Sequence, residues 1–291
     1  MPDADLDAVR AVADRLFAPD APHGCSLALV VRHRDEVVFE RYGRQPDTAF
    51  GPGGPVDADT RLISWSMAKS ITHAAVGIAV GDGLLDVEAP APVPEWAGTE
   101  KAAITVLDLL EMRSGLEFVE DYVDDSVSHC IEMLFGSGRD DVAGYAASLP
   151  LLHEPGTVWN YSSGTTNIVS RIVGDAVGGG RAGMEQFLQE RLFGPIGMTS
   201  ARPVFDAAGT FIGSSYVHAT ARDFSRFGQC YLDGGVVDGT RVLPDGWAEH
   251  ATVRAATDDE TGDGYGRHWW LWPEPVGAFG AHGYEGQYTI V

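Results

Sequence analysis

Two residues in the N-terminal part of the chain have types and a spacing that could do hydrolytic chemistry. Ser66 and Lys69 lie three positions apart, and apolar residues recur every three or four positions over 67–79. This periodicity predicts a helix that begins at Ser66 and carries both side chains on one face. A serine hydroxyl beside a basic group can act as a nucleophile in acyl transfer, and the free N–H groups at a helix start can stabilise an oxyanion.

The use of lysine supports this interpretation. The chain has 20 Lys and Arg residues together, and lysine stands only at positions 69 and 101. Arginine keeps its proton in proteins, whereas a partly buried lysine can lose its proton and act as a base. The alternative is an exposed Lys69 in the first turn of a surface helix, with Ser66 as its N-cap. Apolar residues close to Lys69 on both sides favour burial, and therefore catalysis.

Other elements must place further groups around this helix. Alternating apolar patterns at 26–31 and 36–42 predict an antiparallel hairpin near one end of the chain. The stretches 265–272 and 277–291 read as strands near the other end. The section between these two groups of strands is mainly helical in pattern.

We therefore predict an α/β (α+β) fold in which helices flank an antiparallel sheet built from both ends of the chain. The predicted sheet domain consists of 1–83 and 205–291, and 84–204 is a mainly helical domain inserted between them. Thr105 and Thr220 are expected N-caps of two helices. A cleft is expected where the two domains join.

Composition and charge argue against several functions. The net charge of −22 makes nucleic acid and anionic membranes poor partners. The three cysteines are far apart, lack metal-ligand spacing, and are expected to be reduced thiols. The Gly-rich stretch 51–54 is not followed by a helical pattern, so we expect no dinucleotide cofactor there. Neither a signal peptide nor an apolar run of membrane-spanning length stands out, and we expect a cytoplasmic protein with no metal and no cofactor.

Three motifs occur in order along the chain and together resemble one known superfamily. They are Ser66-Met67-Ala68-Lys69, Tyr161-Ser162-Ser163 and Ala281-His282-Gly283-Tyr284-Glu285-Gly286-Gln287. This set resembles the serine β-lactamases and penicillin-binding proteins. The stretches 109–116, 153–156 and 194–198 are similar to the class C-like branch of that superfamily. The details most resemble 6-aminohexanoate-dimer (nylon-oligomer) hydrolases, with family VIII-type esterases as close neighbours, and a β-lactamase/transpeptidase-like fold is implied.

The resemblance implies a role for each motif residue. Ser66 would attack a carbonyl carbon, and Lys69 and Tyr161 are the two groups able to hold its proton. A phenol with an ordinary pKa near 10 is a poor base, and an adjacent ammonium favours the phenolate. Ser163 occupies the position of the second donor in its motif, and the N–H groups of Ser66 and Tyr284 would form the oxyanion hole. The alternative for Tyr161 is a core aromatic residue that bonds a neighbour.

The third motif departs from the superfamily pattern. If Gly283 matches the glycine of Lys-Thr-Gly, then Ala281 stands in the lysine position and His282 in the threonine position. The missing lysine weakens the β-lactamase and peptidase interpretations, because in those enzymes it helps to hold a substrate carboxylate. Gly283 would let the strand edge approach the substrate closely. His282 is either a substrate contact or a structural histidine, and Tyr122 either lines the substrate side of the site or packs in its loop.

We expect a serine hydrolase that forms an acyl-enzyme on Ser66 and cleaves amide or ester bonds of small molecules. A carboxylesterase, a weak β-lactamase and a catalytically silent ligand-binding relative are the alternatives. The expected partner is therefore a small-molecule amide or ester. The last residues, 287–291, read as a strand without a cap, and we expect a further strand and helix to be missing after 291.

Overall fold

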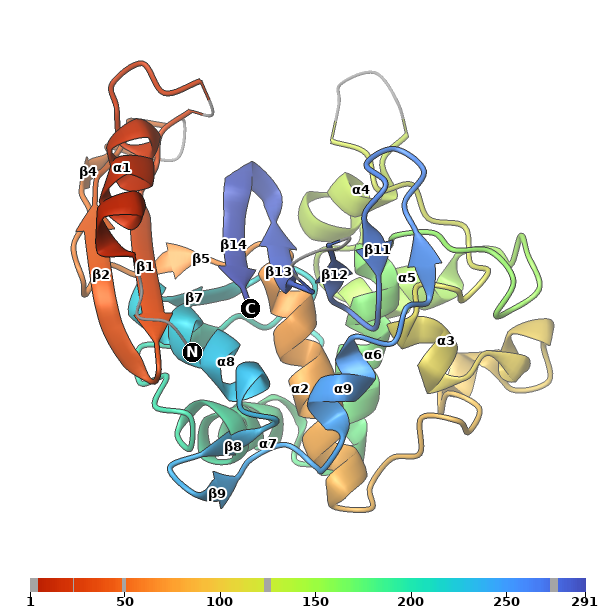
Figure 1. Ribbon diagram of the computed structural model, residues 1–291. Helices are drawn as coiled ribbons and strands as arrows, with labels where there is room; N and C mark the ends of the chain where they lie inside the picture. Colours follow the sequence, from red (N-terminus) through yellow and green to blue (C-terminus); the bar gives the residue numbers. More distant parts are fainter. Residues whose placement is uncertain (1–4, 23, 49–50, 123–126, 273–276) are drawn as a thin grey trace.

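Helix α2 (Met67–Gly81) lies at the centre of the fold, with its N-terminal end close to the sheet that contains β13 and β14 (Figure 1). Apolar residues occur on every side of it, and all its residues from Met67 to Ala79 are buried, including the polar Lys69, Ser70, Thr72 and His73. Small residues let neighbours approach closely: a Cβ at Gly77 would lie 2.3 Å from Nε1 of Trp247. The helix packs against α6 (Ser163–Val177) and β13 (Phe279–Gly283).

The helices surround α2 and make up most of the middle of the chain. The computed structural model describes all residues except 1–4, 23, 49–50, 123–126 and 273–276. The remaining helices are α1 (Leu6–Leu16), α3 (Val106–Leu110), α4 (His129–Phe135), α5 (Val142–Ser148), α7 (Gly180–Phe187), α8 (Ala221–Leu232) and α9 (Trp247–Ala251), with single turns η1 (Pro94–Trp96), η2 (Glu100–Ala103), η3 (Leu188–Phe193) and η4 (Tyr284–Gly286). Every named element from η1 to η3 is helical. The division into two domains stays a prediction.

The strands form several small antiparallel sheets. The largest has the order β10–β11–β12–β13–β14 and lies beside α2. Its strands are β10 (Ala256–Thr257), β11 (Gly264–Tyr265), β12 (Trp270–Leu271), β13 and β14 (Gln287–Ile290). A second sheet has the order β5 (Leu62–Ile63), β7 (Val217–Ala219), β6 (Arg202–Pro203). Two short strand pairs lie elsewhere: β3 (Arg44–Gln45) with β4 (Gly54–Pro55), and β8 (Val236–Val237) with β9 (Thr240–Arg241). Every described strand pairing is antiparallel, which confirms the predicted mixture of helices and antiparallel sheet.

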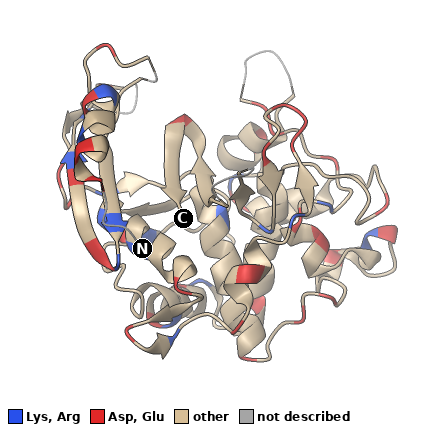
Figure 2. Ribbon diagram, viewed as in Figure 1, with Lys and Arg blue, Asp and Glu red and all other residues tan. Residues whose placement is uncertain are grey.

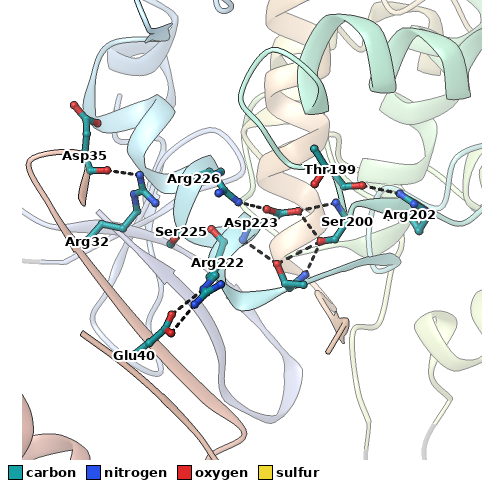
Figure 3. Close-up of polar contacts among 11 residues, drawn as sticks. Arg32, Asp35, Glu40, Thr199, Ser200, Arg202, Arg222, Asp223, Ser225 and Arg226 are labelled. Atoms are coloured by element: carbon teal, nitrogen blue, oxygen red, sulfur yellow. Dashed lines mark hydrogen bonds and ion pairs between the residues drawn. The ribbon is translucent and has the colours of Figure 1, made fainter. Parts of the chain in front are cut away.

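The N-terminal hairpin consists of β1 (Ala28–His33) and β2 (Glu36–Tyr42), close to the predicted ranges. Among the described residues these two strands pair only with each other, and helix α8 packs against both β1 and β14. Figure 3 shows one polar tie between hairpin and helix, in which Arg222 forms a forked ion pair with Glu40 at 2.8 and 2.6 Å. On the other side of α8, Arg226 and the N–H of Ser200 bond the buried Asp223. The helix therefore connects the hairpin to the rest of the molecule.

Two predicted strands are wrong in detail. The stretch 265–272 is two short strands, β11 and β12, separated by a tight turn in which the N–H of Gly266 donates to the carbonyl of Trp269 at 2.8 Å. His268 in this turn has a φ of 61°, a left-handed conformation that strand propensity does not anticipate. The stretch 277–291 is likewise the hairpin β13–β14, because Glu285 and Gly286 turn the chain with φ values of 57° and 74°.

Figure 2 shows the described acidic residues distributed over helices, strands and loops on both sides of the view. Among the described residues, none of the helices combines the length and apolar character needed to cross a bilayer. In the same part of the chain, His, Cys, Asp and Glu side chains do not assemble in groups of three that could hold a metal ion.

Candidate active site

Ser66 and Lys69 meet at the start of α2. Ser66 occupies the N-cap position, yet its hydroxyl makes no capping bond and instead accepts a hydrogen bond from Nζ of Lys69 at 2.9 Å. Lys69 is only 2% exposed, so the alternative of a solvated surface lysine is wrong. Trp65, directly before the serine, has a φ of 43°. Such a conformation is costly for a non-glycine residue and is found preferentially at functional sites.

The ammonium of Lys69 is held by three acceptors. Besides Ser66, Nζ donates to Oγ of Ser163 at 2.9 Å and to the carbonyl of Ser214 at 3.1 Å. Ser163 is the first residue of α6, and Ser214 lies in a buried loop before β7. Three acceptors match the three N–H donors of an ammonium group. Segments far apart in the sequence therefore fix one nitrogen beside the Ser66 hydroxyl.

Tyr161 lies on the other side of the lysine, whose Nζ is 4.8 Å from the centre of the Tyr161 ring. The rings of Tyr265 and Trp270 pack around it, with centroids at 5.8 and 5.6 Å. Burial raises the pKa of Tyr161, and the Lys69 charge opposes this effect without overcoming it. The ammonium thus favours the phenolate, as expected, but the resting side chain is a phenol.

Glu120 is the functional candidate that the sequence interpretation missed. Its carboxylate accepts hydrogen bonds from the N–H and Oγ of Ser163 at 2.7 and 2.5 Å, and from the hydroxyl of Tyr122 at 2.5 Å. Ser163 therefore connects a carboxylate to the Lys69 ammonium. The sequence shows only one acidic residue among several in a loop, and no local pattern distinguishes Glu120 from its neighbours. The distinguishing contact is with a residue 43 positions away.

Tyr122 and Tyr284 form an exposed aromatic edge beside the serine. Tyr122 is 45% exposed, and its ring centroid lies 5.2 Å from that of Tyr284. Tyr284 in turn meets the ring of Trp65 edge-on at 6.0 Å. Burial and the Glu120 charge raise the pKa of Tyr122, so it is a neutral hydrogen-bond donor. The structure thus brings Tyr122 and Tyr284 to the site, while the role of the Tyr284 N–H in an oxyanion hole stays a prediction.

His282 and Gly283 lie on β13 next to this edge. His282 stacks on Trp270 at 5.6 Å and 15°, and packs against Trp272 and Tyr288. Burial lowers the pKa of His282 to about 4, so the ring is neutral near pH 7. Among the described ring contacts of His282, the one with Trp270 connects it to the site, because Trp270 also packs against Tyr161. A Cβ on Gly283 would lie 2.3 Å from the carbonyl oxygen of Ser64, so glycine is needed where β13 passes the segment before Ser66.

The assembled groups suit acyl transfer. A hydroxyl, an ammonium and a phenol converge within one hydrogen-bonded cluster that also contains a carboxylate, and aromatic rings border it on two sides. An ammonium next to a hydroxyl lowers the cost of forming an alkoxide or phenolate. These are the elements of a nucleophile with proton-transfer partners.

Comparison with known proteins gives a consistent result. A family model described as Beta-lactamase matches residues 14–291. The chain is 29% identical over 282 residues to the 6-aminohexanoate-dimer hydrolase of Paenarthrobacter ureafaciens, covering 90% of this chain and 68% of that protein. A solved structure from Bacillus anthracis, described as a candidate 6-aminohexanoate-dimer hydrolase, has a TM-score of 0.76 at 23% identity, over 91% of this chain and 70% of that one. A family VIII carboxylesterase has a TM-score of 0.58 at 18% identity, over 81% and 78% of the two chains. These structures share the fold, which confirms the resemblance drawn from the three motifs.

Proposed function

The chain belongs to the beta-lactamase family and is a serine hydrolase, and we propose that it acts through an acyl-enzyme on Ser66. The observation that carries this proposal is the buried Lys69, whose Nζ lies 2.9 Å from Oγ of both Ser66 and Ser163. Burying an ammonium is costly unless it is fully hydrogen-bonded. The buried Lys69 lies next to the Ser66 hydroxyl, which does not cap the helix. This arrangement is costly to form, and a catalytic role for the two groups accounts for it.

Acylation uses Ser66 as nucleophile and Tyr161 as the proton carrier. Oγ of Ser66 attacks the carbonyl carbon, and its proton passes to Tyr161 in the phenolate form. Tyr161 then returns this proton to the leaving nitrogen or oxygen as the bond between that atom and the carbonyl carbon breaks. Lys69 keeps its proton and stabilises both the phenolate and the attacking oxygen by its charge.

Deacylation repeats these steps with water as the nucleophile. Water gives a proton to Tyr161 as it attacks the acyl carbon, and Ser66 regains a proton as the ester bond breaks. The backbone N–H groups of Ser66 and Tyr284 are the proposed donors to the oxyanion. Tyr284 follows Gly283, whose missing Cβ lets β13 approach Ser64. The close approach of β13 to Ser64 supports the proposal that the N–H groups of Ser66 and Tyr284 act together on the oxyanion.

The proposed substrates are small molecules with amide bonds. Taking the proton of Ser66 turns Tyr161 into a phenol, which can protonate an amine leaving group that departs poorly without a proton. Ala281 is buried and uncharged where lactam-binding relatives carry a lysine, so β13 supplies no cation for a substrate carboxylate. The similarity to a 6-aminohexanoate-dimer hydrolase supports a linear amide. An ester substrate is the alternative, and similarity in fold to a family VIII carboxylesterase supports it.

Covalent labelling tests the nucleophile. A fluorophosphonate probe should add once to the wild-type protein and should leave Ser66→Ala unlabelled, as read by intact mass. Ser137→Ala, at an exposed serine, is the matched control and should label like the wild type. Persistent labelling of Ser66→Ala would show that another residue is the nucleophile. Rates on p-nitrophenyl esters, nitrocefin and linear aminohexanoate amides then rank the substrate classes, and higher kcat/KM on esters would refute the amide preference.

A further inference from the structure

The turn between β11 and β12 carries an unusual buried histidine. His268 is 2% exposed and adopts a left-handed backbone conformation with φ of 61°. This conformation costs about 1 kcal/mol or more for a residue with a Cβ, and it persists only where surrounding structure enforces it. The proposed chemistry does not use His268, and its sequence neighbourhood predicts a plain strand.

Both neighbours of His268 are firmly anchored. The guanidinium of Arg267 forms a partly buried ion pair with Glu111 at 3.0 Å. The backbone N–H of Arg267 donates to the carbonyl of Ala251 at 3.0 Å. Trp269 is fully buried and stacks on Phe227 at 5.7 Å and 14°. Because each flanking residue is fixed by its own contacts, the chain between them is forced into the strained turn.

The strained turn aims His268 at the first turn of α2. Nδ1 of its ring lies 3.1 Å from the carbonyl oxygen of Lys69, and its own carbonyl accepts a hydrogen bond from Oγ of Ser70 at 2.6 Å. On the far side of the ring, Nε2 lies 3.3 Å from the hydroxyl of Thr166 on α6. One side chain and its carbonyl therefore hold two consecutive residues of α2 against α6.

The ring can donate to only one neighbour at a time. Burial, together with the charge of Lys69, lowers the pKa of His268 to about 3, whereas the carbonyls of Lys69 and Leu109 act in the opposite direction. The ring is neutral near pH 7 and carries a single proton. A carbonyl oxygen can only accept, so a proton on Nδ1 accounts for the contact with Lys69.

The first turn of α2 carries Lys69, so the position of its backbone decides where the ammonium lies. Ser66 stands at the N-cap, but its hydroxyl bonds Lys69 and does not cap the helix. The backbone N–H groups of Met67, Ala68 and Lys69 donate instead to the carbonyls of Ser64, Trp65 and Ser66 at 3.2, 3.0 and 3.0 Å. The Lys69 side chain must nevertheless reach acceptors at 2.9, 2.9 and 3.1 Å together. A small rotation of its backbone would break at least one of these contacts.

We propose that His268 is a positioning residue, which fixes the backbone of Lys69 through the Nδ1 contact and so holds the ammonium between Ser66 and Ser163. This inference rests on the proposed function of Ser66 and Lys69. It assigns a role to the strained turn, which brings the His268 ring and carbonyl into hydrogen-bond contact with Lys69 and Ser70. His268 touches neither Ser66 nor the proposed substrate, and acts only through Lys69.

Two substitutions separate the two ends of the ring. His268→Asn places an amide nitrogen near the position of Nδ1 and tolerates a left-handed conformation, so it keeps the donation to Lys69. His268→Gln places its amide nitrogen near Nε2 and keeps the Thr166 side instead. We expect His268→Gln to lower kcat about 10- to 100-fold with KM within about twofold, since a misplacement near 1 Å has effects of this size. His268→Asn should recover to within about fivefold of the wild type.

A second readout follows Lys69 without relying on activity. The chain has only two lysines, so 13C-lysine labelling gives two Cε signals, and Lys101→Arg assigns them. The Lys69 signal should move in His268→Gln and return close to its wild-type position in His268→Asn. His250→Gln is the matched control, because His250 contacts His73, one turn further along α2. It should leave kcat and the Lys69 signal unchanged.

The outcomes distinguish the two proposals. An unmoved Lys69 signal with wild-type kcat in His268→Gln would overturn the positioning role. Equal losses in the Asn and Gln variants would also overturn it, because they indicate a general packing role for the ring. If the wild type fails to label at Ser66 while the Lys69 signal responds as predicted, the positioning stands and the acyl-enzyme proposal fails.

Discussion

Replacing Glu120 by glutamine probes the carboxylate that sequence reasoning did not identify. In the wild type, Oε2 accepts from the N–H of Ser163, and Oε1 accepts from the hydroxyls of Ser163 and Tyr122. Glutamine has one acceptor oxygen and one donor nitrogen. The backbone N–H of Ser163 cannot rotate, so it retains the oxygen, and the new NH2 group faces both hydroxyls. Ser163 must then turn its own proton away from residue 120, where Lys69 already donates to Oγ.

The expected loss follows from these contacts. The exposed Tyr122 hydroxyl can turn and accept from the new NH2 group, so the main loss is the bond from the Ser163 hydroxyl. A hydrogen bond to a charged group contributes about 1.5–3 kcal/mol, and partial exposure of Glu120 reduces this to about 1–2 kcal/mol. For a chain of this size that corresponds to a fall in Tm of about 2–3 °C. Reorientation of Ser163 moves one of three acceptors of Lys69, so kcat should fall about tenfold.

Three measurements check this prediction. Thermal unfolding gives the change in Tm, steady-state kinetics on the best substrate of the panel gives kcat, and ultraviolet titration compared with Tyr122→Phe follows the Tyr122 phenol. The Glu120 carboxylate raises the pKa of Tyr122, so Glu120→Gln should lower it. Glu117→Gln, three positions earlier in the same loop, is the control. Wild-type kcat and Tm in Glu120→Gln would refute the argument that the carboxylate orients Ser163.

Three further predictions follow from groups around the site. Because burial raises the pKa of Tyr161 and the phenolate is the proposed base, kcat/KM should increase with pH from neutral into the alkaline range, and a falling profile would contradict that role. Gly283→Ala brings a Cβ to 2.3 Å from the carbonyl of Ser64, so it should lower stability by about 1–3 kcal/mol and weaken activity, whereas Gly54→Ala, with open space around it, should do neither. Neutral His268 contributes stability that is complete above its unfolded pKa near 6.5 and is lost as pH falls toward about 3, so denaturant midpoints of the wild type should fall more steeply with acid than those of His268→Asn.

Much of the fold could be predicted because local chemistry and tertiary structure agree there. The N-caps Thr105 and Thr220 accept hydrogen bonds from the N–H of Asp108 and Asp223, as their side chains and positions indicate. The helix after Ser66 was evident from its apolar period, which no competing pattern disturbs. The motifs also identified residues that meet in space, since Ser66, Lys69 and Ser163 form one hydrogen-bonded chain.

The two features that the sequence did not predict, the turn at His268 and the role of Glu120, share a different cause. The turn at His268 exists because Arg267 and Trp269 are held by distant residues, whereas a local window rich in Trp and Tyr predicts a strand. Glu120 is likewise defined by where its loop lies against the start of α6. In both places the conformation is imposed from outside the segment. Both segments touch residues at or next to Lys69, where local preference yields to the requirements of the site.

The distribution of lysine and arginine has a geometric reason. The structural ion pairs use the planar fork of arginine: Arg222 bonds both oxygens of Glu40, and Arg191 bonds both oxygens of Asp82. A fork suits two acceptors that lie side by side in one plane. Lys69 instead faces three acceptors from three segments around a single nitrogen, an arrangement that a guanidinium cannot satisfy and a tetrahedral ammonium can. Lys69→Arg would therefore keep the charge and still lose at least one of the three contacts, which makes charge alone an insufficient description of what this position requires.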